Sequence, residues 1–201
     1  MQCPMEKLGV WINEERKKGA VFPQGAVLST VSVKGKPRSR VVGTMLTEKN
    51  GGGKILRFHT SPNSRKITDI NNNVYAALTY SFNESVRSVS IEGKISPLSA
   101  EVLDCDWQSF DENFRRHYLI FGSQSGNTLE SPSFLNDQKA KQQDEPILIR
   151  PDSFIGFELS IINRVSFYSV KDNDFAVNEL FERKLSKDKQ EQNWKHSFLV
   201  P

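Results

Sequence analysis

Residues 26–33 read AVLSTVSV, residues 38–46 read RSRVVGTML and residues 54–60 read KILRFHT. Each run is rich in β-branched residues and has the length of a single strand. A turn with glycine and proline separates the first two runs, and a glycine-rich turn, residues 48–53, separates the second from the third. Strands joined by such short turns predict an antiparallel meander.

The rest of the chain continues this pattern. Further strands are predicted at residues 74–81, 86–95, 147–168, 180–185 and 196–200. Helices are predicted at residues 7–18, at residues 62–71 and from Ser99 to Gly122. Because the strands do not alternate with helices, the pattern favours a mainly β fold, an antiparallel barrel of about six to eight strands with peripheral helices.

The composition indicates one domain over residues 1–201, with an N-terminal helical segment at residues 1–22 and a polar loop at residues 136–145. The net charge of +3, from 27 Lys+Arg and 24 Asp+Glu, is too small to indicate nucleic-acid binding. No apolar run approaches the roughly 18 residues of a membrane span, and the charged N-terminus does not resemble a signal peptide. We therefore expect a cytoplasmic protein without nucleic-acid or membrane partners.

Common catalytic and metal-binding motifs are absent from the sequence. His59, His117 and His196 are isolated from one another, and no C-x-x-C or H-x-x-H spacing occurs, so no metal site is predicted. Cys3 and Cys105 do not form a disulfide framework. No catalytic residue is identified by this search.

One segment has the features of an anion site. Residues 61–66 (SPNSRK) follow a predicted strand and open a predicted helix, with Ser61 as its N-cap. Free N–H groups at a helix start favour a phosphate, to which Arg65 and Lys66 add charge. Arg40 adds a third cation if it points to the same end of the barrel. The alternative is that Arg65 and Lys66 are ordinary solvated helix charges.

The predicted long helix carries one apolar stripe. The stripe consists of Leu103, Trp107, Phe110, Phe114 and Tyr118. This spacing is typical of a core-facing helix surface, although the same side chains could line a substrate pocket.

Several short motifs, taken in order, resemble the pyridoxamine 5′-phosphate oxidase family. They are residues 40–43 (RVVG), 58–61 (FHTS), 64–66 (SRK), 89–93 (VSIEG), 122–125 (GSQS) and a tail with Trp194 and FLVP at residues 198–201. The resemblance implies a split β-barrel that forms a homodimer and holds FMN in clefts between the subunits.

The resemblance also implies roles for individual residues. The FMN phosphate is expected at Arg40, Ser64, Arg65 and Lys66, and the isoalloxazine beside the backbone of Val41, Val42 and Gly43. His59 and Thr60 are expected near the ring or the ribityl chain. Ser88 occupies the position of a flavin-contacting glutamine, and Gln124 and Ser125 are expected to reach the FMN of the neighbouring subunit.

The sequence departs from the family on the substrate side. Met45 stands where the family has a lysine that binds the substrate phosphate, and Asp111 falls near a phosphate-binding arginine. Trp107 falls near the corresponding tyrosine, and Glu158 near a flavin-contacting tryptophan. Arg164 matches a retained arginine and is the one candidate substrate ligand.

These matches and departures leave three functions open. The favoured one is an FMN-binding oxidoreductase that transfers a hydride from an unidentified small substrate to FMN. The first alternative is a genuine pyridoxine/pyridoxamine 5′-phosphate oxidase, and the second is a non-enzymatic flavin-binding protein.

Overall fold

The computed structural model describes residues 3–48, 53–129, 131–141, 149–170, 175–183 and 194–201. Its strands are β1 (Gly25–Val31), β2 (Pro37–Glu48), β3 (Lys54–Thr60), β4 (Tyr75–Phe82), β5 (Arg87–Pro97), β6 (Ile155–Ser169), β7 (Val177–Glu182) and β8 (Lys195–Leu199). Its helices are α1 (Pro4–Lys17), α2 (Arg65–Asn72), α3 (Ala100–Ser109), α4 (Glu112–Phe121) and α5 (Ser133–Lys141).

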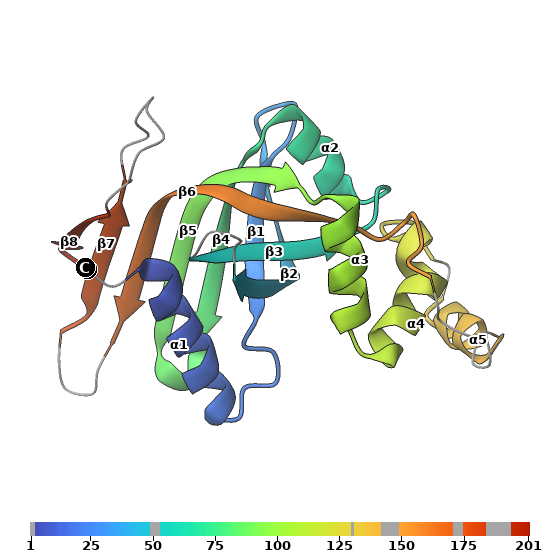
Figure 1. Cartoon of the computed structure of the whole chain (residues 1–201), viewed down its shortest axis with the longest axis horizontal. Helices are drawn as coiled ribbons and strands as arrows, with labels where there is room; N and C mark the ends of the chain where they lie inside the picture. The colour runs from blue at the N-terminus through green and yellow to red at the C-terminus, as the bar shows by residue number, and fades with distance from the viewer. Residues whose placement is uncertain (1–2, 49–52, 130, 142–148, 171–174, 184–193) are drawn as a thin grey trace.

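The strands form one antiparallel sheet in the order β3-β2-β1-β4-β5-β6-β7-β8. An additional pairing of β3 with β6 closes the first six strands of this order into a barrel, and β7 and β8 extend the sheet beyond it. Figure 1 shows α3, α4 and α5 gathered at one side of the barrel, with β7 and β8 at the other. The predicted antiparallel barrel with peripheral helices is confirmed.

The barrel interior is filled by alternating apolar side chains, because successive residues of a strand face opposite sides of the sheet. Leu28, Leu78 and Ile91 lie in this core, each fully buried. On α1, Met5, Leu8 and Ile12 join the same cluster. The N-terminal helix therefore covers one open end of the barrel, as Figure 1 shows.

The helix predicted at residues 62–71 begins later than expected. Its first residue is Arg65, and Ser64 rather than Ser61 occupies the N-cap position. Pro62 and Asn63 instead form a turn, in which the Ser64 N–H donates to the Ser61 carbonyl. The prediction failed because this extra turn lies between β3 and α2 and lets Ser61 remain buried at the strand end.

The helix predicted from Ser99 to Gly122 is two helices. Ser99 does cap α3, since its side chain accepts a hydrogen bond from the Val102 N–H. Phe110 then has an extended backbone, and Asp111 caps α4 by accepting from the Phe114 N–H at 2.9 Å. An aspartate is a strong N-cap, and the break allows both helices to pack around the buried Phe154.

The polar segment at residues 136–145 was predicted as a loop, but its first part is helical. Residues 136–141 belong to α5, whose Ala, Lys and Gln residues have high helix propensity. Residues 142–148, and the glycine-rich turn at residues 49–52, lie outside the described residues.

Candidate functional site

A groove of about 390 Å³ runs along the barrel beside α4. One wall is backbone and side chains of β2 and of the end of β3, and the other is α4 and the residues that follow it. The lining residues are Val41, Val42, Gly43, His59, Thr60, Ser61, Lys66, Phe114, His117, Tyr118, Phe121, Gly122 and Ser125.

A second pocket of about 340 Å³ shares Lys66 with the groove. It lies between β2 and the start of α2, and its lining includes four cationic side chains. The lining residues are Arg38, Ser39, Arg40, Ser64, Arg65, Lys66 and Gly126. We call it the cationic pocket. Its position next to the groove allows one elongated ligand to place an anionic end here and a flatter part in the groove.

Asp69 fixes the geometry of the cationic pocket. This α2 residue is 1% exposed, and its carboxylate accepts hydrogen bonds from Arg38 at 2.8 Å, from Arg40 at 3.3 Å and from the Thr30 hydroxyl at 2.8 Å. The aspartate thereby joins α2 to β1 and β2. One carboxylate cannot neutralise four cations, so the pocket keeps an excess of positive charge.

Lys66 connects the two cavities. Its Nζ donates to Thr60 Oγ1 at 2.8 Å and to Ser64 Oγ at 2.7 Å, and no described carboxylate pairs with it. Partial burial, together with the nearby positive charge of Arg40, lowers the pKa of Lys66 below that of an ordinary lysine. An ammonium in this state gains from any bound anion. The residues therefore fit the phosphate of FMN.

Burial also lowers the pKa of Arg40, against the opposing effect of Asp69. Arg65 is exposed at the rim of the cationic pocket. No hydrogen-bond or ion-pair partner for it occurs within the described part of the chain. Its guanidinium is thus available for a bidentate contact to a phosphate.

His59 is held at the base of the groove. Its Nε2 lies 3.0 Å from Asp106 Oδ2, which accepts the hydrogen bond, and Arg57 donates to the other oxygen of the same carboxylate at 3.1 Å. The His59 ring stacks on Phe154 with their centroids 4.7 Å apart. These contacts hold the orientation of the imidazole.

Asp106 is a site residue that the sequence reasoning missed. It lies on the buried face of α3 together with Leu103 and Trp107. A carboxylate at a core position of an amphipathic helix is the signal that could have identified it, because buried charges are almost always paired.

The sequence left open whether the apolar stripe belongs to the core or lines a substrate pocket. In the structure, some of its residues do the first and others the second. Trp107 is fully buried in a small cluster with Leu103 and Phe154, so it belongs to the core. Phe114 and Tyr118 line the groove, and Phe110 packs against both Phe114 and Phe154. The single O–H of Tyr118 is shared between the carbonyls of Thr60 and Ser153, and burial raises the pKa of this phenol.

Ten of the predicted cofactor-site residues meet at these two cavities. The groove brings together Val41, Val42, Gly43, His59, Thr60, Lys66 and Ser125, and the cationic pocket Arg40, Ser64, Arg65 and Lys66. Ser125 lines the groove of its own chain, which differs from the expectation that it reaches only the neighbouring subunit's FMN. Gln124 precedes it and is exposed.

Two predicted residues lie away from the groove. Ser88 is on β5, which β1 and β4 separate from β2. Arg164 on β6 lies between two carboxylates, 3.6 Å from Glu92 and 3.5 Å from Glu182. The structure therefore does not bring Arg164, the candidate substrate ligand, to either cavity.

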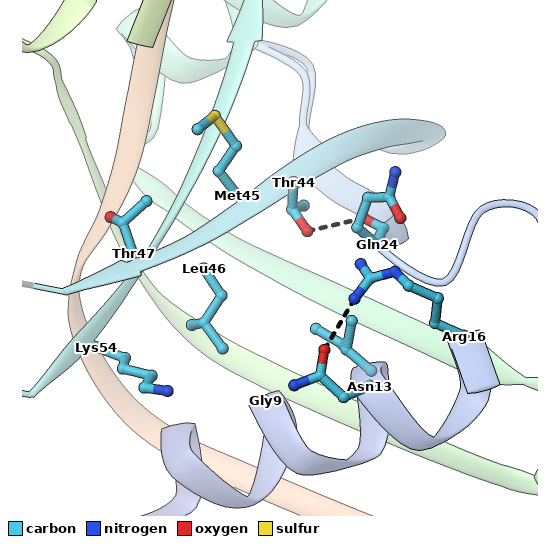
Figure 2. A pocket seen from close by; sticks show the side chains of 10 residues that line it. Gly9, Asn13, Arg16, Gln24, Thr44, Met45, Leu46, Thr47 and Lys54 are labelled. Carbon is cyan, nitrogen blue, oxygen red and sulfur yellow. Dashed lines mark hydrogen bonds between the residues drawn. The ribbon is translucent and has the colours of Figure 1, made fainter. Parts of the chain in front are cut away.

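Met45 lines a separate pocket of about 410 Å³ between α1 and β2. Figure 2 shows Leu46 pointing towards α1 and Met45 pointing away from it. In the same view Arg16 donates to Asn13, and the Thr44 hydroxyl donates to the Gln24 carbonyl.

Asp111 is engaged as the cap of α4, and Glu158 lies opposite Arg57 in the β3–β6 pair.

None of the helices described is long and apolar enough to cross a membrane. Within the same residues, no three His, Cys, Asp or Glu side chains gather as a metal site would require.

Sequence comparisons relate the chain to known proteins. A family model for pyridoxamine 5′-phosphate oxidase matches residues 22–138. The pyridoxine/pyridoxamine 5′-phosphate oxidase of Cytophaga hutchinsonii is 36% identical over 109 residues, which cover 54% of this chain and 49% of that protein. The protein of the same name from Legionella pneumophila is 28% identical over 172 residues, covering 85% of this chain and 77% of its own. The first match thus spans about half of the relative's length.

Two solved structures share the fold over nearly the whole chain. PhzG from Burkholderia lata, in complex with tetrahydrophenazine-1-carboxylic acid, has a TM-score of 0.79 at 20% identity and covers 98% of this chain and 92% of its own. A pyridoxamine 5′-phosphate oxidase-related, FMN-binding protein from Nostoc punctiforme has a TM-score of 0.78 at 18% identity, covering 100% and 98%. At these identities the likeness establishes a common fold.

Proposed function

This chain belongs to the pyridoxamine 5′-phosphate oxidase family, and on that premise we propose that it is an FMN-dependent oxidoreductase for a small substrate less anionic than pyridoxine 5′-phosphate. The family match confirms the resemblance carried by the motifs, and FMN is the cofactor that this family assigns to the chain. The substrate, the reaction and the assembly are parts of the proposal.

The observation that carries the proposal is Lys66 at the junction of the two cavities. It is a partly buried ammonium without a described carboxylate partner, flanked by Arg40 and Arg65. Such a group favours a dianionic phosphate, and charge-assisted hydrogen bonds are the strongest that a protein offers. The phosphate of FMN is therefore assigned to the cationic pocket and its ring to the groove.

Other residues position the ring and exclude water from it. The strand backbone of Val41–Gly43 lies along one side of the groove, and Phe114 and Tyr118 supply aromatic surface on the other. The hydrogen bonds of Tyr118 to the Thr60 and Ser153 carbonyls tie α4 to the end of β3 and hold this wall in place. Bound FMN supplies the redox chemistry, because its ring accepts a hydride from a substrate and returns the electrons to an acceptor.

Two measurements test this function. The purified protein should show the visible absorption of bound flavin, and added FMN should restore it in flavin-free protein. Anaerobic addition of a suitable electron donor should then bleach that absorption, and air should restore it. A protein that does not bind FMN contradicts the proposal, whereas one that binds FMN but does not cycle is the non-enzymatic flavin-binding protein.

We expect oxidation of pyridoxine 5′-phosphate to be very slow. Neither cavity receives a cation from the family's substrate-phosphate positions, because Met45 is apolar and lines a separate pocket, Asp111 caps α4, and Arg164 lies between Glu92 and Glu182. Each lost charge-assisted contact should lower kcat/KM by about 10- to 100-fold. The measurement is peroxide and pyridoxal 5′-phosphate production by FMN-loaded protein. Rapid turnover by the unaltered chain would identify it as a genuine oxidase.

We also propose that the protein is a homodimer. Four uncharged residues are paired in a row across the outer face of four neighbouring strands. They are Val41 of β2, Val27 of β1, Thr79 of β4 and Ser90 of β5. Val41 is 66% exposed and also lines the groove, so a second copy on this face would cover the groove as well. Ser88 lies two residues from Ser90 on the same face, which supports a contact to the partner's flavin rather than its own.

If the site is shared in this way, FMN binding and dimerisation should favour each other. Light scattering is expected to report twice the mass of one chain, and dilution should release flavin together with monomer. The charge substitution Val41→Asp should shift the equilibrium to monomer and lower FMN affinity at low protein concentration. A monomer that retains stoichiometric FMN on dilution would contradict the shared site but not the fold.

A further inference from the structure

Ser61 is a groove residue with an unused hydrogen-bonding group. It follows directly after β3, at the point where the groove meets the cationic pocket through Lys66. The residue is 2% exposed, and its Oγ has no hydrogen-bond partner in the described part of the chain. Its neighbours differ in this respect, because Thr60 Oγ1 and Ser64 Oγ both accept from Lys66.

A buried hydroxyl without a partner costs stability, and most buried polar groups in folded proteins are satisfied. Alanine in its place is expected to fold at least as well, because the hydroxyl makes no hydrogen bond within the described part of the chain. Such an unpaired group in the wall of a binding cavity is best explained by a partner that arrives with the ligand.

We propose that the Ser61 hydroxyl is a flavin-binding group that contacts the ribityl chain or the polar edge of the ring, not the phosphate. This inference rests on the proposed function. The assignment to the ribityl and ring part follows from position, because Ser61 lines the groove and does not line the cationic pocket. A ribityl chain that joins a ring in the groove to a phosphate in the cationic pocket must pass Lys66, next to this serine.

The test compares flavin affinity with the stability of the flavin-free protein in Ser61→Ala. A neutral hydrogen bond lost from the complex should weaken FMN binding by about 3- to 10-fold. Riboflavin binding, measured by quenching of flavin fluorescence at high protein concentration, should weaken by the same factor. The Tm of the flavin-free variant should be unchanged or raised, since the variant removes an unpaired buried group.

Ser32→Ala is the matched control. Ser32 is also buried, but its Oγ accepts from the Lys36 N–H at 3.0 Å in the turn between β1 and β2. This control should lower the Tm of the flavin-free protein and leave flavin affinity unchanged. The isosteric Ser61→Cys, with a weaker donor, should give an intermediate affinity and provides a second variant if Ser61→Ala does not fold.

Three results would overturn the inference. They are equal FMN affinity in Ser61→Ala and the unaltered protein, a loss confined to FMN and absent for riboflavin, or a Tm loss in the flavin-free variant without any affinity loss. If riboflavin affinity is too low to measure, the Ser61→Ala/Arg65→Ala double variant decides whether Ser61 contacts a part of FMN other than the phosphate. Independent contacts to two parts of FMN have multiplicative effects on its affinity. Failure of the unaltered protein to bind any flavin would instead contradict the proposed function.

Discussion

Lys66→Ala is expected to weaken FMN binding by about 10- to 100-fold. The side chain has no described carboxylate partner, so its charge is available to a bound phosphate without breaking an existing ion pair. Riboflavin, which lacks the phosphate, should bind weakly to the unaltered protein and be little affected. Isothermal titration of flavin-free protein with both ligands measures the two effects.

Lys34→Ala is the charge-matched control for this prediction. Lys34 is exposed in the turn between β1 and β2, so its removal changes the net charge equally without touching either cavity. Arg65→Ala should resemble Lys66→Ala, because Arg65 also lines the cationic pocket. Equal FMN affinity in Lys66→Ala, Arg65→Ala and the unaltered protein would contradict the assigned phosphate site.

The lowered pKa of Lys66 predicts the direction of the pH dependence. A bound dianion favours the ammonium form and raises this pKa again, so FMN binding should take up a proton between the lowered pKa and the pKa in the complex. FMN affinity should therefore fall as the pH rises through that alkaline window. The stability of the flavin-free protein should change in the opposite direction, because the unfolded chain holds the Lys66 proton more tightly. Both dependences should be weaker in Lys66→Ala.

Trp107→Ala is expected to lower the free energy of unfolding by about 3–5 kcal/mol. Trp107 is the largest fully buried side chain of the protein's described part, and its ring packs against Phe154 and Tyr118. Its loss leaves a cavity under the groove wall, which should also reduce FMN affinity. Urea denaturation measured by circular dichroism gives the change in stability.

Gln108→Ala, one residue further along α3, is the control for this cavity. Gln108 is exposed, so its replacement should change stability by no more than about 0.5 kcal/mol. A cost below 1 kcal/mol for Trp107→Ala would mean that the aromatic stripe does not support the groove through this residue.

Local signals in the sequence were sufficient for most secondary structure. The β-branched runs predicted β1 to β3 to within a few residues, and Ser99 was correctly identified as the cap of α3. The prediction of one long helix from Ser99 to Gly122 was wrong because two local signals competed at residues 110–111. The apolar stripe continued through this point, but the capping interaction of Asp111 started a new helix.

The motifs also identified the family. Its strand motifs and a helix start with adjacent cations occur along this chain in the same order as in the family. By itself, then, the sequence determined the antiparallel barrel with its peripheral helices and, through the family resemblance, the FMN cofactor and the grouping of Arg40, Arg65 and Lys66. These features depend on residue types at short spacings, which a linear pattern records.

The tertiary structure alone decided which side chains are paired and which are left free. Asp69 pairs with Arg38 and Arg40 but not with Lys66, Asp106 holds His59 from 47 residues away, and Arg164 lies between Glu92 and Glu182. The groove likewise forms only where the end of β3 meets α4 and the residues that follow it. Such contacts join positions far apart in the chain, and their energies depend on distance and desolvation in the folded protein, which no local spacing encodes.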